Sequence, residues 1–302
     1  MITNRIKLAK DFKISPIVQG HWRIDAWKFS NQDLLKHTEQ CIELGINTFD
    51  HADIYGDYSC EKLFGNALKL KKGLRKEIQI ITKCGIKLLS NKFPSREIHY
   101  YDYSYEHIIE SVENSLKNLD TDYIDLLLLH RPAPFFNPKE VAKAFTYLKA
   151  KGMVINFGVS NFTPIQFAML SQFTDEKLIT NQVEISPYCL EHFENGNIDF
   201  FLKESINPMA WSPLSGGDFL NKNTAKNKRI IKALTEVANE LQIDTIEKVI
   251  YCWLLKHPVN IIPIVGTSKI ERLKYAIEAL HIQMSLEQWY KIYKAATGVE
   301  LP

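Results

Sequence analysis

Short apolar runs alternate with longer amphipathic runs along almost the whole chain. Several of the short runs are unbroken apolar stretches, which is typical of parallel strands that are covered on both faces. Eight segments have this character, and we expect each of them to form a strand: residues 14–18, 46–50, 78–82, 124–129, 155–159, 178–182, 207–211 and 260–265.

The segments between these strands have the 3.6-residue period of helices. The clearest is 104–119, in which Ile108, Val112, Leu116 and Leu119 fall on one face. Residues that favour helix N-termini mark further helix starts. These are Asn137 with Pro138, Thr163 with Pro164 and Gln166, Ser268 with Glu271, and Ser285.

Eight strands that alternate with helices predict a (β/α)8 TIM barrel, for which ~250 residues is typical. The alternative is an open doubly wound sheet, but no GxGxxG follows the first strand, which argues against a dinucleotide-binding half there. The charged, alternating segment 6–14 predicts a short N-terminal hairpin at the bottom of the barrel. We expect one domain, residues 1–302, with an extra C-terminal helix after Ser285.

Composition narrows the class of protein. The chain is 45% hydrophobic and 24% charged with a net charge of +2, which indicates a globular protein without a basic surface for nucleic acid. No apolar run approaches the ~20 residues of a membrane span. The five cysteines are scattered without a CxxC pair, and the N-terminus has no signal peptide, so we expect a cytoplasmic protein without disulfides or a metal site. The oligomeric state stays open.

The predicted strands end in polar residues, and functional side chains of (β/α)8 barrels lie at the C-terminal ends of strands. We therefore expect a site at this end of the barrel. The residues concerned are Asp50, Thr82, Lys83, His130, Arg131, Ser160, Asn161, Asn181, Gln182, Glu184, Trp211, Ser212, Gly266, Thr267 and Ser268.

Each of these residues also has an ordinary structural explanation. His130 would be a hydrogen-bonded rim histidine, Lys83 a surface lysine with a packed stem, and Tyr55 one of 13 tyrosines that fill space. Because they share one end of one barrel, we interpret them as one site. His51 and Asp53, on the same loop as Tyr55, are expected to be structural.

The segment FDHADIYGDY, residues 49–58, places carboxylates beside a phenol directly after a strand. A free tyrosine titrates near ~10, too high to release its proton readily at neutral pH. An ammonium ~4 Å away stabilises a phenolate by ~4 kcal/mol at an effective dielectric of ~20, or roughly three pKa units. We therefore expect Lys83 to lower the pKa of Tyr55, with Asp50 offsetting part of the shift. His130 would orient a carbonyl group or relay the proton.

Seven motifs follow one another along the chain: FDHADIYGDYSCEKLFG, ITKCG, LLLLHRP, FGVSNF, NQVEISP, AWSPLSGG and IVGTSKIERLKYAIEA. Together they resemble the aldo-keto reductase superfamily, and within it the bacterial oxidoreductases of the YdhF-like type. The likeness runs through nearly the whole chain. It implies a (β/α)8 barrel and an NADPH-dependent oxidoreductase that reduces a small-molecule aldehyde or ketone to an alcohol.

The resemblance also implies the roles of single residues. Its catalytic tetrad falls on Asp50, Tyr55, Lys83 and His130, where Tyr55 would protonate the carbonyl oxygen as hydride arrives from the nicotinamide. Other positions would bind the cofactor. Near the nicotinamide these are Gly20, His21, Ser160, Asn161, Gln182 and Trp211, of which Trp211 would stack under the ring. Along the pyrophosphate they are Ser212, Leu214 and Gly216.

The last motif has a physical explanation of its own. Gly266, Thr267 and Ser268 precede a helix, so free backbone N–H groups would face a phosphate. By resemblance, Arg272 would pair with the 2′-phosphate of the cofactor and Lys269 would add charge, which favours NADPH over NADH. Without the resemblance, an ordinary helix start with a surface arginine is the simpler interpretation.

Four positions depart from the family pattern. His51 stands where Thr or Ser is frequent, and Trp211 replaces a more frequent tyrosine while it keeps a stacking face. Tyr275 and Ala276 stand where many members place Glu and Asn against the adenine. The adenine would therefore be held by stacking, and the cofactor preference is less firmly implied.

Two other functions stay open. The first is a cofactor-binding regulatory or redox-sensing subunit with little turnover, and the second is a lyase in which Lys83 forms a Schiff base. The substrate is not identified, because an aromatic aldehyde, a quinone and a sugar-like carbonyl all suit the expected lining. That lining comprises Trp22, Tyr55, His130, Phe135 or Phe136, and the loop 84–103.

Overall fold

The computed structural model describes residues 2–220 and 223–301 and contains a closed barrel of eight parallel strands. Each strand pairs with the next one along the chain, and the last pairs with the first, so the predicted (β/α)8 barrel is confirmed. The strands are β3 (Val18–Gly20), β4 (Thr48–Asp50), β5 (Gln79–Cys84), β8 (Ile124–Leu129), β9 (Val154–Ser160), β10 (Leu178–Glu184), β11 (Met209–Trp211) and β12 (Ile262–Val265).

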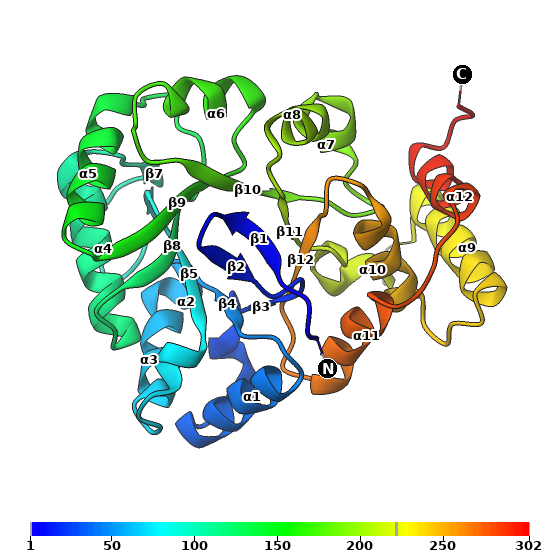
Figure 1. The fold of residues 1–302 in the computed structure, drawn as a ribbon, viewed down its shortest axis with the longest axis horizontal. Coiled ribbons are helices and arrows are strands. Elements are labelled where there is room, and N and C mark those ends of the chain that lie inside the picture. Colours follow the sequence, from blue (N-terminus) through cyan, green and yellow to red (C-terminus); the bar gives the residue numbers. More distant parts are fainter. Residues whose placement is uncertain (1, 221–222, 302) are drawn as a thin grey trace.

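Helices surround the barrel (Figure 1). Those of the β/α repeat are α1 (Asn31–Glu43), α3 (Cys60–Leu68), α4 (Tyr105–Leu119), α5 (Pro138–Ala150), α6 (Pro164–Ser171), α8 (Asn197–Glu204), α10 (Ile246–Lys256) and α11 (Ile270–Ala279). Two more, α9 (Ala225–Glu240) and the predicted C-terminal helix α12 (Leu286–Thr297), pack together at one side of the barrel. Short elements complete the chain: α2 (Tyr55–Tyr58), α7 (Glu191–Glu194), the 3-10 helices η1 (Ile24–Trp27), η2 (Leu74–Glu77) and η3 (Ser215–Leu220), and the hairpin β6 (Ile86–Lys87)–β7 (Tyr100–Tyr101).

Most of the predicted helix starts are confirmed by side chains that accept hydrogen bonds from backbone amides of the first turn. These are Asn137 at α5, Thr163 at α6 and Ser285 at α12. The prediction for Ser268 is wrong, because α11 begins after Lys269 and no side chain caps it. The hydroxyl of Thr267 instead accepts from the N–H of Lys269 at 3.1 Å, within the turn that precedes the helix.

A two-stranded hairpin, β1 (Ile6–Ala9) and β2 (Phe12–Ile14), lies across the centre of the barrel in Figure 1. Leu8, Phe12 and Ile14 are buried against the apolar side chains that fill the barrel interior. The side chain of Gln79, at the start of β5, donates to the carbonyl of Lys13 at 3.0 Å. The predicted hairpin at the bottom of the barrel is therefore confirmed.

The bounds predicted for the first barrel strand, 14–18, are wrong. Ile14 ends the hairpin, and the barrel strand starts only at Val18. Pro16 lies between them and has no N–H to contribute to a ladder. The N–H of Ser15 donates to the Thr48 hydroxyl at 3.1 Å, which ends the strand at this point.

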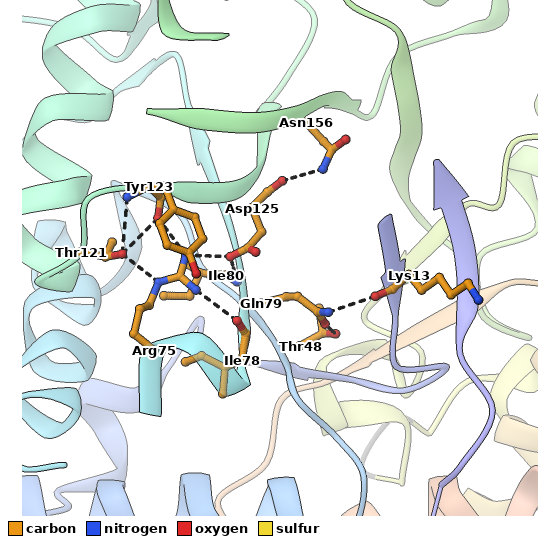
Figure 2. A network of polar contacts seen from close by, with 10 residues as sticks. All are labelled: Lys13, Thr48, Arg75, Ile78, Gln79, Ile80, Thr121, Tyr123, Asp125 and Asn156. Carbon is orange, nitrogen blue, oxygen red and sulfur yellow. Dashed lines mark hydrogen bonds and ion pairs between the residues drawn. The ribbon is translucent and has the colours of Figure 1, made fainter. Parts of the chain in front are cut away.

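A partly buried polar network ties the strands together near the hairpin (Figure 2). Arg75 and Asp125 form an ion pair at 2.7 Å, and the same carboxylate accepts from the N–H of Ile80 at 2.9 Å. Asn156 donates to the backbone carbonyl of Asp125 at 3.1 Å. Ile80, Asp125 and Asn156 lie near the starts of β5, β8 and β9, and Arg75 lies in η2 just before β5. The network therefore stabilises the end of the barrel opposite the predicted site.

No helix in the part of the chain that the structure describes is both long and apolar enough to cross a membrane. All five cysteines lie in that part as free thiols, and four of them are buried. The described side chains also contain no group of three or more histidine, cysteine, aspartate or glutamate residues arranged to hold a metal ion.

Candidate active site

The loop after β4 brings a phenol over the neighbouring strand. Asp50, the last residue of β4, stands beside Ile81 of β5 in the parallel register. The chain then continues along β5, since the N–H of Asp53 donates to the carbonyl of Lys83 at 3.1 Å. Two residues later the loop enters α2, and Tyr55 comes to lie against the Lys83 side chain.

Lys83 lies at the centre of the site, with 1% of its side chain exposed. Its ammonium donates to both oxygens of Asp50 at 2.9 and 2.8 Å, to the carbonyl of His51 at 2.7 Å and to the hydroxyl of Tyr55 at 3.0 Å. Gln182 of β10 donates to the same Asp50 carboxylate at 2.8 Å. The structure therefore brings Asp50, Tyr55 and Lys83 together, as the sequence predicts.

The ammonium of Lys83 keeps its proton in this setting. Burial lowers the pKa of Lys83, but the charges and hydrogen bonds of Asp50 and Tyr55 outweigh burial and raise it above its ordinary value. The site thus holds a fixed positive charge 3.0 Å from a phenol oxygen.

The prediction that the pKa of Tyr55 is lowered is wrong for this structure. Burial raises the pKa of Tyr55, and the attraction of Lys83, with a smaller contribution from Arg131, does not compensate. Asp50 raises it further, because its negative charge cancels much of the Lys83 field. Tyr55 therefore carries its proton at neutral pH, which is the state that a proton donor needs.

His130 approaches Tyr55 from the end of β8, the strand that pairs with β5. It follows β8, and its ring centroid lies 5.8 Å from the Tyr55 ring in an edge-on arrangement. Burial, and then the charges of Lys83 and Arg131, hold the pKa of His130 well below its ordinary value. The imidazole is therefore neutral, with one donor and one acceptor nitrogen.

These groups line a cavity of about 620 Å³ at the C-terminal end of the barrel. The volume lies in the usual range for small-molecule sites. Most of the residues expected at the site face this cavity. They are Gly20, Trp22, Asp50, Tyr55, His130, Arg131, Ser160, Asn161, Gln182, Trp211, Ser212, Leu214, Gly216, Gly266, Thr267 and Arg272.

Some predicted residues are absent from the lining. Phe135 is 96% exposed, and Phe136 packs instead against Phe162 and Tyr103. The Tyr275 ring lies under the Lys248 ammonium at 5.1 Å rather than at the cavity. Ser268 and Lys269, which precede α11, are also outside the lining.

His21 is buried behind the cavity wall. Its Nδ1 lies 3.0 Å from Nε2 of His51, and its ring packs against Phe49 and Phe64. Burial, followed by the nearby charge of His51, holds the pKa of His21 well below its ordinary value. Both histidines therefore belong to the wall that supports the site, as expected for His51 but not for His21.

The structure adds lining residues that the sequence did not indicate. They are Arg23, Trp27, Ile54, Gly217, Tyr251, Ile264 and Val265. Ile86, His99 and Tyr101 also line the cavity and belong to the loop 84–103 that was expected there, and Pro213 belongs to the stretch expected along the pyrophosphate. Arg23 had a signal that could have been used, because it closely follows the first strand. Tyr251 had none, since it lies in the middle of α10.

One wall of the cavity carries amide and hydroxyl groups that hold one another in place. Trp211 donates from Nε1 to the Asn161 side-chain oxygen at 3.0 Å, and Asn161 donates to the Ser160 hydroxyl at 2.8 Å. Ser160 in turn donates to the carbonyl of Gln182 at 2.8 Å. This wall offers polar partners and an aromatic face, which suit a planar aromatic ring that bears a carboxamide group.

The charged lining suits an anionic ligand. Arg23, Arg131 and Arg272 line the cavity, and Asp50, the only carboxylate among the described lining residues, is neutralised by Lys83. Backbone is also accessible close to Gly266, where an added Cβ would have only one described neighbour within 4 Å, at 3.8 Å. A nicotinamide cofactor with a pyrophosphate group therefore fits the residues present.

Comparisons with known proteins agree with this geometry. The model of the aldo/keto reductase family matches residues 16–297. The chain is 49% identical to the oxidoreductase YcsN of Bacillus subtilis, with 99% of each chain covered, and 44% identical to the oxidoreductase YdhF of Escherichia coli, with 96% of each covered. A 6-dehydroglucose reductase of Agrobacterium fabrum is 39% identical, over 98% of this chain and 99% of its own. The structure of the glycerol dehydrogenase AKR11B4 from Gluconobacter oxydans shares the fold, with a TM-score of 0.84 at 20% identity, over 100% of this chain and 98% of its own.

Proposed function

The chain belongs to the aldo/keto reductase family of NAD(P)H-dependent oxidoreductases, and from that premise we propose that it reduces an aldehyde or ketone with NADPH, using Tyr55 as the proton donor. One observation carries the proposal. The Lys83 ammonium joins the Tyr55 hydroxyl to the Asp50 carboxylate at the wall of a cavity of about 620 Å³. The same proposal assigns His130 to the carbonyl oxygen.

The protein residues then have distinct tasks. NADPH, when bound, supplies hydride to the carbonyl carbon. Tyr55 donates a hydrogen bond to the carbonyl oxygen and transfers its proton as negative charge develops there. Lys83 stabilises the phenolate that remains, at 3.0 Å, and Asp50 keeps Lys83 charged and in place. His130, neutral in this structure, orients the carbonyl oxygen with a second hydrogen bond.

Cofactor binding is assigned to two parts of the cavity. The amide wall of Ser160, Asn161 and Gln182 would hold the carboxamide, and Trp211 would stack on the ring. At the other part, Arg272, which forms an ion pair with Glu247 at 3.7 Å, would bind the 2′-phosphate. Direct titration tests the preference for NADPH, since a dissociation constant for NADH equal to or lower than that for NADPH would contradict it.

The class of substrate can be narrowed by similarity. Relatives at 39% and 37% identity are 6-dehydroglucose reductases, which supports a polar, sugar-like carbonyl compound for this chain. His99 and Tyr101 line the cavity and would provide polar contacts for such a molecule. Comparison of 6-dehydroglucose with simple aromatic aldehydes as substrates tests this assignment.

Tyr55→Phe tests the central assignment. We expect turnover of a panel of aldehydes, ketones and quinones to fall by a factor of about 10² or more, because general acid catalysis contributes about 10²–10⁴. The NADPH dissociation constant should change less than about threefold, because an interaction lost only in the chemical step leaves ground-state binding intact. Tyr290→Phe on the distant helix α12 is the matched control, with unchanged turnover.

Other outcomes separate the alternatives. If Tyr55→Phe keeps more than a tenth of the wild-type rate, Tyr55 is not the acid. If the wild type binds NADPH but turns over no carbonyl compound, a regulatory role replaces the reductase. Failure to bind either nicotinamide cofactor would reject the cofactor assignment itself.

A further inference from the structure

A cation beside the catalytic groups has no task in the function proposed above. Arg131 directly follows His130 and lines the cavity. We propose that Arg131 binds an anionic group of the substrate, so that this enzyme prefers carbonyl compounds that carry a carboxylate or a phosphate. This inference rests on the proposed reductase function and specifies its substrate class.

The backbone of Arg131 is fixed by a buried phenol. The Tyr103 hydroxyl accepts from the N–H of Arg131 at 3.0 Å and donates to its carbonyl at 2.5 Å. Tyr103 is 4% exposed, and its ring occupies the space beside Gly85, where an added Cβ would lie 2.0 Å from it. The root of the arginine side chain is therefore held in position before a ligand arrives.

Among the side chains that the structure describes, none is an anionic partner of the Arg131 guanidinium. Of the two other arginines of the cavity, Arg272 forms an ion pair with Glu247, and Arg23 donates a hydrogen bond to the backbone carbonyl of Gly216. The guanidinium of Arg131 lies instead 5.4 Å from the centre of the Trp211 ring. A cation in a cavity without a protein counter-charge attracts an anionic ligand, and its planar fork matches carboxylate and phosphate oxygens.

The position of this cation suits the substrate better than the cofactor phosphates. Arg131 neighbours His130 in sequence and acts electrostatically on both Tyr55 and His130. The cofactor phosphates are assigned to the part of the cavity near Gly266 and Arg272. A substrate with its carbonyl at Tyr55 and an anionic group a few bonds away would therefore reach Arg131.

The test compares Arg131→Gln with wild type on two pairs of aldehydes of similar shape. One pair is 4-carboxybenzaldehyde and 4-nitrobenzaldehyde, and the other is glyceraldehyde 3-phosphate and glyceraldehyde. We expect kcat/KM to fall about ten- to hundredfold for the charged member of at least one pair, as for loss of a hydrogen bond to a charged group. The loss should lie mainly in KM, the neutral members should change less than about threefold, and the two pairs distinguish carboxylate from phosphate.

Two further variants make the result specific. Arg131→Lys keeps the charge but not the fork, so it should recover part of the loss for charged substrates only. Arg229→Gln on α9, whose guanidinium donates to the carbonyl of Ala295, is the matched control and should leave all four substrates unaffected.

Several results would overturn the inference. Equal losses for charged and neutral aldehydes would show that Arg131 serves the general machinery of the site. A weaker NADPH affinity in Arg131→Gln, with unchanged selectivity, would place Arg131 on the cofactor. Absence of turnover with all four aldehydes would overturn the proposed function and this inference together, whereas the other two results overturn this inference alone.

Discussion

Replacing Lys83 by methionine removes a buried ammonium while it keeps a side chain of similar length, and we expect losses of both stability and turnover. The Asp50 carboxylate, whose side chain is 4% exposed, would lose its ion pair. Removal of one partner from a buried pair costs about 3–5 kcal/mol. We expect the lower end of this range, because the hydrogen bond from Gln182 to Asp50 at 2.8 Å remains.

This free energy can be converted to a melting temperature. An unfolding entropy of ~2.1 cal/mol/K per residue, applied to 302 residues, gives ~0.6 kcal/mol/K. A loss of ~3 kcal/mol then lowers Tm by ~5 °C. Turnover should fall by about 10²–10⁴, since the phenolate of Tyr55 would lose the charge that stabilises it.

Thermal melting and steady-state kinetics of three variants check this reasoning. Lys83→Met alone should show both losses, and Lys83→Met with Asp50→Asn should recover much of the Tm but none of the turnover, because the unpaired charge is gone. Lys69→Met is the control, since Lys69 is exposed and its ion pair with Asp120 at 3.4 Å contributes at most about 1 kcal/mol. A Lys83→Met protein that melts within about 1 °C of wild type, or keeps a tenth of its turnover, would refute the argument.

Two further predictions concern the wall behind Lys83, and thermal melting checks both. Burial raises the pKa of Asp53 to about 8, whereas the unfolded residue titrates near ~3.9, so between these pH values the unfolded chain releases a proton that the folded chain retains. The wild-type protein therefore loses stability as pH rises. Relative to wild type, the free energy of unfolding of Asp53→Asn should increase by up to ~1.4 kcal/mol per pH unit from pH 4 to 8. A difference between the two proteins that does not depend on pH would contradict this prediction. Gly85→Ala should lower Tm by several degrees, because φ is +106° and the new Cβ meets the Tyr103 ring. In the control Gly152→Ala, nothing described lies within 4 Å of the new Cβ, so only backbone strain of roughly 1–2 kcal/mol applies, and equal losses in the two variants would reject the steric argument.

The sequence predicted those parts of the fold that depend on local pattern. The bounds of β8 were predicted as observed, 124–129, because five of its six residues are apolar, as is typical of a strand covered on both faces, and Asp125 is the exception. The bounds of the first strand were predicted wrongly, because Ile14 and Val18 are equally apolar on either side of Pro16 although they belong to different sheets. A pattern of hydrophobicity marks burial but does not tell which neighbour covers the residue.

The candidate site was predicted in its residue types but only partly in its arrangement. Asp50, Tyr55 and Lys83 meet because their strands end at one edge of a parallel barrel, a rule that the chain order alone supplies. The pKa of Tyr55 could not be predicted, because it depends on how deeply the phenol is buried and on how far Asp50 cancels the Lys83 charge. Both quantities depend on distances that the sequence does not contain.

By itself, then, the sequence determined the order of the elements, the polar strand ends and the family pattern, since each of these is a property of neighbouring or regularly spaced residues. Only the tertiary structure decided that Arg23 and Tyr251 reach the cavity and that His21 lies behind its wall. It also decided that the Arg131 cation stands without a described counter-charge beside His130. The physical reason is closure of the barrel, which sets the distances and burial of residues far apart in the chain, and with them the electrostatics of the site.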